Sequence, residues 1–161
     1  MLRYLAPAFA VLLSAAPLVA QEPAPTIADV NVTVDLENVD ANALDHWPRI
    51  DGDLTDAILA AADPWLASEG LTISVVVTEI SLAGAPGLPE SGEFNRLGGW
   101  VYIREDPGQP PLKSEQITLG ADTYTPGGTS EFHIIPGRPD FYTALLNVFA
   151  ARTLEEVQEL R

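Results

Sequence analysis

The sequence contains no cysteine, and this absence excludes several kinds of site. A chain without thiols forms no disulfide bond, builds no thiolate metal centre and offers no N-terminal cysteine for lipid attachment. We also expect no cofactor. The fold must therefore be held together by packing and non-covalent polar contacts alone.

Positive charge is nearly as scarce. The chain has 8 Lys and Arg residues against 23 Asp and Glu residues, a formal net charge of −15 at pH 7, and Lys113 is the only lysine. Such a charge repels phosphate backbones and anionic lipids, so we expect no nucleic-acid partner. The acidic residues are scattered rather than clustered, which favours an ordinary exported surface over a calcium-rich one.

Long apolar runs are also missing, apart from one short run at the N-terminus. Arg3 precedes the apolar stretch 5–20, "LAPAFAVLLSAAPLVA", which two prolines interrupt before the chain turns polar. This pattern predicts a signal peptide over residues 1–20, with cleavage after Ala20. An uncleaved N-terminal anchor is the alternative. We therefore expect a periplasmic or secreted protein with no stable membrane span once the signal is removed.

The remaining chain is long enough for one domain, residues 27–161, after a flexible lead-in over residues 21–26. Alternating apolar and polar residues predict strands at 27–39, 71–83, 96–105 and 112–122, and a short strand at 131–135. Helical spacing predicts a helix from Leu54 to Gly70 with a break at Pro64, and a final helix over 141–160. A glycine- and proline-rich segment, 83–95, separates two of the strands.

The predicted fold class is α+β. We expect an antiparallel sheet of four to five strands with two helices packed on one face, in the order β-α-β-β-β-(β)-α. One side of these strands is strongly apolar and should form the core. Its members are Val30, Val32, Val34, Leu71, Ile73, Val75, Val101, Ile103, Ile117 and Leu119.

The stretches "VNVTVDL", "GLTISVVVTEISL", "LGGWVYI" and "FYTALLNVFA" carry a resemblance at the level of architecture. In this order they resemble small exported or lipoprotein-like α+β domains of bacterial cell envelopes, mostly families of unknown function. The chain differs from the lipoprotein members because it has no cysteine to acylate. The resemblance implies an envelope location but transfers no site residue.

The stretch "DHWPRIDGDLTDAI", residues 45–58, has the composition of a site. Read as a calcium loop from Asp51, it has Asp56 where glycine is needed and Ala62 where glutamate is needed. His46 has no second ligand at zinc spacing. We therefore interpret the stretch as a helix entry with Asp53 as the N-cap. A weak calcium-binding module is the remaining alternative.

Signals for catalysis are few. No G-x-S-x-G motif is present, and no serine occupies a strand-turn-helix context that would expose it. The carboxylates of the loops or His133, within the predicted strand 131–135, are the candidates for a small periplasmic hydrolase. This hydrolase is the alternative to a protein without enzymatic activity.

The most informative residues face away from the predicted core. In "GWVYIRE" the core side chains Val101 and Ile103 alternate with Trp100, Tyr102 and Arg104, which must point outward. The same reasoning places Val76 and Ile80 on that side. Because Trp, Tyr and Arg are enriched at binding hot spots, we predict a surface for an envelope or periplasmic protein. The alternative is that the segments 83–95 or 106–112 cover these side chains.

Overall fold

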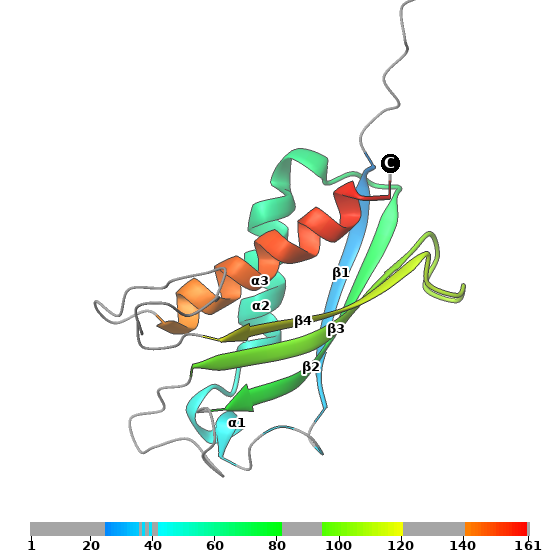
Figure 1. Ribbon diagram of the computed structural model, residues 1–161. Helices are drawn as coiled ribbons and strands as arrows, with labels where there is room; N and C mark the ends of the chain where they lie inside the picture. Colours follow the sequence, from blue (N-terminus) through cyan, green and yellow to red (C-terminus); the bar gives the residue numbers. More distant parts are fainter. Residues whose placement is uncertain are drawn as a thin grey trace, which may run out of the picture.

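The computed structural model describes residues 25–35, 37, 39, 42–81, 95–120 and 141–160. The predicted signal peptide 1–20, the lead-in up to residue 24 and the predicted strand 131–135 lie outside these residues. The described part confirms an α+β fold. Figure 1 shows its elements along the chain.

Within the described residues, four strands form one sheet in the order β1-β2-β3-β4. Three helices and a short 3-10 segment accompany them in the same part of the chain. The strands are β1 (Ile27–Val34), β2 (Leu71–Ser81), β3 (Arg96–Arg104) and β4 (Lys113–Gly120). The helices are α1 (Ala43–His46), α2 (Ile50–Ala62) and α3 (Phe141–Gln158), with the 3-10 segment at Asp63–Trp65.

The sheet is mixed, which corrects the purely antiparallel prediction. β1 and β2 run parallel, pairing from Ile27↔Leu71 to Val34↔Val77, whereas β2–β3 and β3–β4 are antiparallel. The physical reason is the helical connection. Helix α2 carries the chain back along the sheet, so β2 starts at the same end as β1. β3 and β4, which follow each other along the chain, form an antiparallel hairpin.

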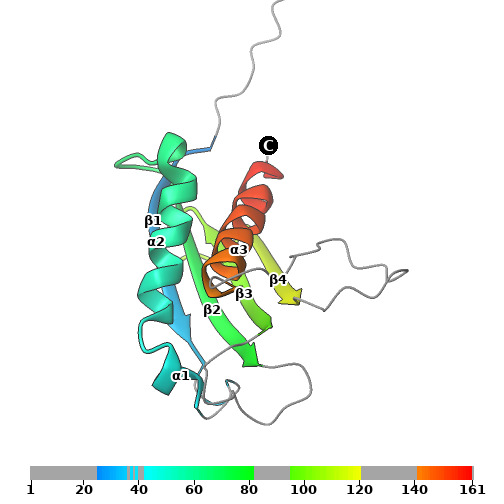
Figure 2. The ribbon, with the colours of Figure 1, turned by 90° about the vertical axis from the view of Figure 1, so that its left-hand side faces the viewer.

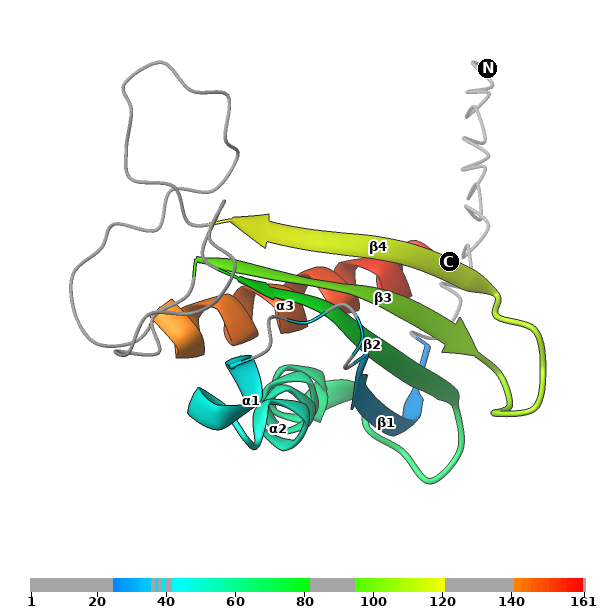
Figure 3. The same ribbon diagram turned by 90° about the horizontal axis from the view of Figure 1, so that it is seen from below.

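Helices α2 and α3 lie side by side over one face of the sheet, as predicted (Figure 2). α2 covers β1, and α3 covers β3 and β4. Seen from below, the short helix α1, which was not predicted, lies beside α2 (Figure 3). Between helices and sheet lies a core that contains the predicted apolar residues, all buried except the half-buried Val34 and Leu71.

Gly99 explains how closely α3 approaches the sheet. A Cβ atom at this position would lie 2.8 Å from the Val76 carbonyl oxygen and 3.4 Å from the ring of Phe149. Phe149 belongs to α3 and is fully buried. The missing side chain on β3 therefore makes room for the fully buried ring of Phe149.

Helix α2 begins four residues earlier than predicted. Its first residue is Ile50, its N-cap position is Arg49, and no side chain caps it by hydrogen bonding. The predicted cap Asp53 lies inside the first turns. The apolar side chain of Ile50 is fully buried, so tertiary packing extends the helix beyond the capping signal. The predicted break at Pro64 is present as the 3-10 segment.

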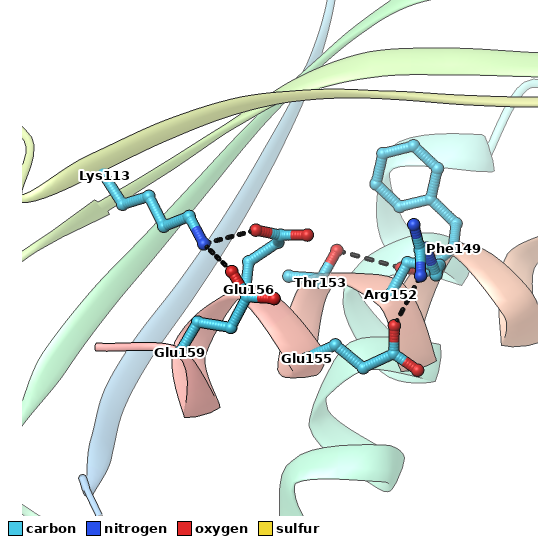
Figure 4. Close-up of polar contacts among 7 residues, drawn as sticks. All are labelled: Lys113, Phe149, Arg152, Thr153, Glu155, Glu156 and Glu159. Carbon is cyan, nitrogen blue, oxygen red and sulfur yellow. Dashed lines mark hydrogen bonds and ion pairs between the residues drawn. The ribbon is translucent and has the colours of Figure 1, made fainter. Parts of the chain in front are cut away.

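The end of α3 is held to the sheet by Lys113. Its Nζ lies 2.6 Å from a carboxylate oxygen of Glu156 and 2.6 Å from one of Glu159 (Figure 4). Thr153 is buried and donates its hydroxyl to the Phe149 carbonyl oxygen. Helix α3 therefore continues without interruption across this position.

Candidate binding surface

The sheet face opposite the helices is the candidate surface, called the outward face below. Cross-strand pairing places Trp100 between Val76 and Gln116, and Tyr102 between Ser74 and Ser114. No described helix packs on this side (Figure 3). The floor around the two aromatic rings therefore consists of small or uncharged side chains.

Trp100, Tyr102 and Arg104 form a row along β3. The Trp100 and Tyr102 ring centroids are 6.4 Å apart with planes 19° from parallel. The Arg104 guanidinium lies over the Tyr102 ring, 5.1 Å from its centroid. Trp100 is 38% exposed, while Tyr102 and Arg104 are half-buried. These contacts between neighbouring side chains restrain the positions of the two rings and the guanidinium.

Arg104 is unusual in its electrostatics. Among the Lys and Arg residues that the structure describes, it alone forms no salt bridge. Its cross-strand neighbour is Thr72, a buried but uncharged residue. The other four described bases, Arg49, Arg96, Lys113 and Arg152, each pair with a carboxylate.

Charges on the outward face cancel. At one end of β3, Arg96 Nε lies 2.9 Å from Glu79 Oε1. At the other end, the unpaired Arg104 is on the same face as Asp29, two strands away through Thr72. Among the residues of the four strands, two bases thus meet two acids on this face, in a chain whose formal net charge is −15. The face is far less negative than the molecule as a whole.

Ile80 does not belong to this surface, which corrects the sequence prediction. The pairing of β2 with β3 shifts between Val77 and Glu79, so a β-bulge inserts one extra residue. Side chains beyond a bulge change faces relative to a regular strand. Ile80 consequently pairs with Leu97 and is fully buried, whereas Val76 stays on the outward face, half-buried.

An open hollow of about 330 Å³ lies near the Arg104 end of β3. It is lined by Pro25, Thr26, Gly70, Leu71 and Glu105. At this hollow the backbone of Gly70 lies close to that of Thr26. Only glycine fits there, because its φ is 151° and a Cβ atom would meet the Thr26 carbonyl oxygen. The carboxylate of Glu105 makes the hollow unfavourable for an anion.

The stretch 45–58 takes part in a polar contact between helices. The Tyr142 hydroxyl of α3 donates to Asp53 Oδ2 at 2.7 Å, and its ring stacks on Trp47 with centroids 3.8 Å apart. Burial, and then the hydrogen bond to Asp53, raise the pKa of Tyr142 well above its usual value. A raised pKa keeps the phenol protonated, so that its hydroxyl can donate to Asp53 and join α3 to α2. We call this contact the Tyr142–Asp53 lock.

Sequence reasoning missed this lock because its partners are 89 positions apart. Within the described residues, no three His, Asp or Glu side chains gather in a group that could hold a metal ion. His133, the segment 83–94 and the other catalytic candidates there lie outside the described residues. No described helix is both long and apolar enough to span a bilayer.

The comparisons with known proteins add no relative. No family model matches the chain, and no curated protein or solved structure is significantly similar to it.

Proposed function

We propose that this is an exported, non-enzymatic domain that binds a protein or another envelope component through the outward face of its sheet. One observation carries the proposal. Trp100 remains 38% exposed in a row with Tyr102 and Arg104, on a sheet face that no described helix covers. Exposed Trp, Tyr and Arg are the residue types that dominate binding energy at interfaces.

The surrounding charge supports the same function. Because of the net charge of −15, the rest of the molecule repels other acidic proteins electrostatically. The outward face, where two bases offset two acids, is the region least subject to that repulsion. The N-terminal pattern over residues 1–20 supports export, and a periplasmic or secreted location would place the partner in the same compartment.

Site-specific photo-crosslinking in cells that produce the protein tests this function. A photoreactive residue replacing Gln116, beside Trp100 on the outward face, should give a discrete crosslinked product. The matched control replaces Thr143, which is exposed on α3. Trp100→Ala should remove the product from position 116.

The same variant must remain folded for this result to count. Because Trp100 is partly exposed, Trp100→Ala should cost less than about 1 kcal/mol of unfolding free energy, as surface changes usually do. A loss of about 3 kcal/mol, the value for a buried aromatic, would show that the ring is core. Equal crosslinking from positions 116 and 143 would contradict a function for the outward face.

A further inference from the structure

We propose that Arg104 receives one side-chain carboxylate of a partner polypeptide, with an apolar side chain of the same segment lying against Trp100. This inference rests on the proposed function and specifies its partner. The occupant is a peptide segment that carries a single Asp or Glu close to an apolar residue. It is neither a polyanion nor a sugar chain.

The first step concerns the cation. A guanidinium presents five N–H donors in a rigid fork that matches a carboxylate. The guanidinium carbon of Arg104 lies over the Tyr102 ring, 5.1 Å from its centroid. A contact with a ring face uses none of the N–H donors of the guanidinium, so these stay available to a second partner. Among the described bases only Arg104 has no carboxylate of its own chain, so an external anion completes its coordination.

The second step concerns the number of charges. Arg104 is the one described base on the outward face that contacts no carboxylate, since Arg96 is paired with Glu79. Glu105 follows it directly, and Asp29 lies on the same face. A run of acids would therefore meet one attractive charge and several repulsive ones, in a molecule of net charge −15. One carboxylate fits, and a polyanion does not.

The third step separates a peptide from a sugar. Flat carbohydrate rings need an open aromatic face, but Arg104 covers one face of Tyr102, and the Trp100 ring is nearly parallel to it. The cross-strand neighbours Ser74 and Ser114 are small, so an extended main chain can pass beside the row. Trp100 supplies the apolar contact that gives such a segment most of its affinity.

The test uses peptides selected from a displayed random library on the purified protein. We expect selected sequences to share one Asp or Glu close to an apolar or aromatic residue. In synthetic peptides, replacing that Glu by Gln should weaken the dissociation constant at least about tenfold, the range for a hydrogen bond to a charged group. Arg104→Gln should cause the same loss, and the two changes together should cost little more than either alone.

Two variants control the experiment. Arg104→Lys keeps the charge but not the fork, so its loss should be smaller than that of Arg104→Gln. Arg152→Gln removes one positive charge from α3, on the helical side, and should leave the dissociation constant unchanged. Melting temperatures of all variants, measured in parallel, identify any that fail to fold, and Arg104→Lys then replaces Arg104→Gln as the deciding variant.

Three outcomes would overturn the inference. If peptide binding is lost in Trp100→Ala but unaffected by Arg104→Gln, the carboxylate site is wrong while the proposed surface stands. If selection yields polyacidic peptides, or if polyglutamate or an acidic polysaccharide displaces the selected ones, the single-carboxylate partner is wrong. If neither variant affects any selected peptide, or none is selected, both the inference and the proposed function fail.

Discussion

Tyr142 shows how one residue changes the meaning of a local sequence pattern. Asp53 has the position and chemistry of a helix cap in "DGDLTDA", yet its carboxylate accepts a hydrogen bond from Tyr142 on another helix. Arg49 adds a longer contact of 3.7 Å to the same carboxylate. Local capping rules could identify Asp53 as structural but not name its partner, because the partner comes from a distant part of the chain.

The Tyr142 hydroxyl should contribute measurably to stability. Tyr142→Phe keeps the ring that stacks on Trp47 and removes the hydroxyl that donates to Asp53. We expect it to lower the free energy of unfolding by about 1.5 kcal/mol, as for a hydrogen bond to a charged acceptor. Urea denaturation followed by circular dichroism measures the change.

Tyr102→Phe is the matched control. It deletes the same atom from a half-buried tyrosine on the outward face, and it should change stability by less than about 0.5 kcal/mol. Equal losses in the two variants would contradict the assignment of the 142 hydroxyl as a lock between α2 and α3.

At the scale of elements, strand alternation predicted the two faces of β3 correctly. Val101 and Ile103 are buried, whereas Trp100, which precedes Val101 on the opposite side of the strand, is exposed. Alternation failed at Ile80 because the β-bulge after Val77 has no signature in the sequence of β2. The direction of β1 relative to β2 also follows from the path of α2 across the sheet, which periodicity does not encode.

Two glycines offer a test of how closely these elements pack. Gly99→Ala places a Cβ 2.8 Å from a backbone oxygen of β2 and against Phe149, so β3 must shift away from its neighbours. We expect a loss of about 1–3 kcal/mol, the range for overpacking. Gly52→Ala, inside α2 with no atom within 4 Å of the new Cβ, should instead stabilise by about 0.5–1 kcal/mol.

Melting curves of the two variants decide the matter. Opposite shifts in melting temperature are expected for these chemically identical changes. A neutral Gly99→Ala would mean that α3 does not approach β3 as closely as the ring of Phe149 indicates.

For the whole molecule, the composition indicated a domain held without covalent links, and the core found between sheet and helices agrees with this. The row Trp100–Tyr102–Arg104 was predictable because each member follows from alternation within one strand. The lack of a carboxylate partner for Arg104 was not predictable, since it depends on where every acid of the described chain lies. Contacts between residues far apart in the sequence therefore account for most of the features that the sequence did not predict.

The same acidic balance makes Lys113, the only lysine, a test of how the last helix is held to the sheet. The hydrogen bond to Glu156, then that to Glu159, raises the pKa of Lys113 above its usual 10.5. The hydrogen bond from Lys113 lowers the pKa of Glu159 below its usual 4.5. The ion pairs of Lys113 with Glu156 and Glu159 therefore contribute their full stability between the usual pKa of the glutamate, 4.5, and that of the lysine, 10.5. They weaken as pH falls through the lowered pKa or rises through the raised one.

Lys113→Gln should consequently lower the melting temperature most at neutral pH, and the difference from wild type should shrink near about pH 3 and above about pH 11. Comparing the variant with wild type at each pH removes most of the general repulsion among the carboxylates, which also changes with pH. Arg152→Gln changes the net charge equally and breaks an exposed pair within α3, so its effect should be small throughout. A Lys113→Gln loss that stays constant from about pH 3 to pH 8 would mean that side-chain packing, not the ion pairs, joins α3 to β4.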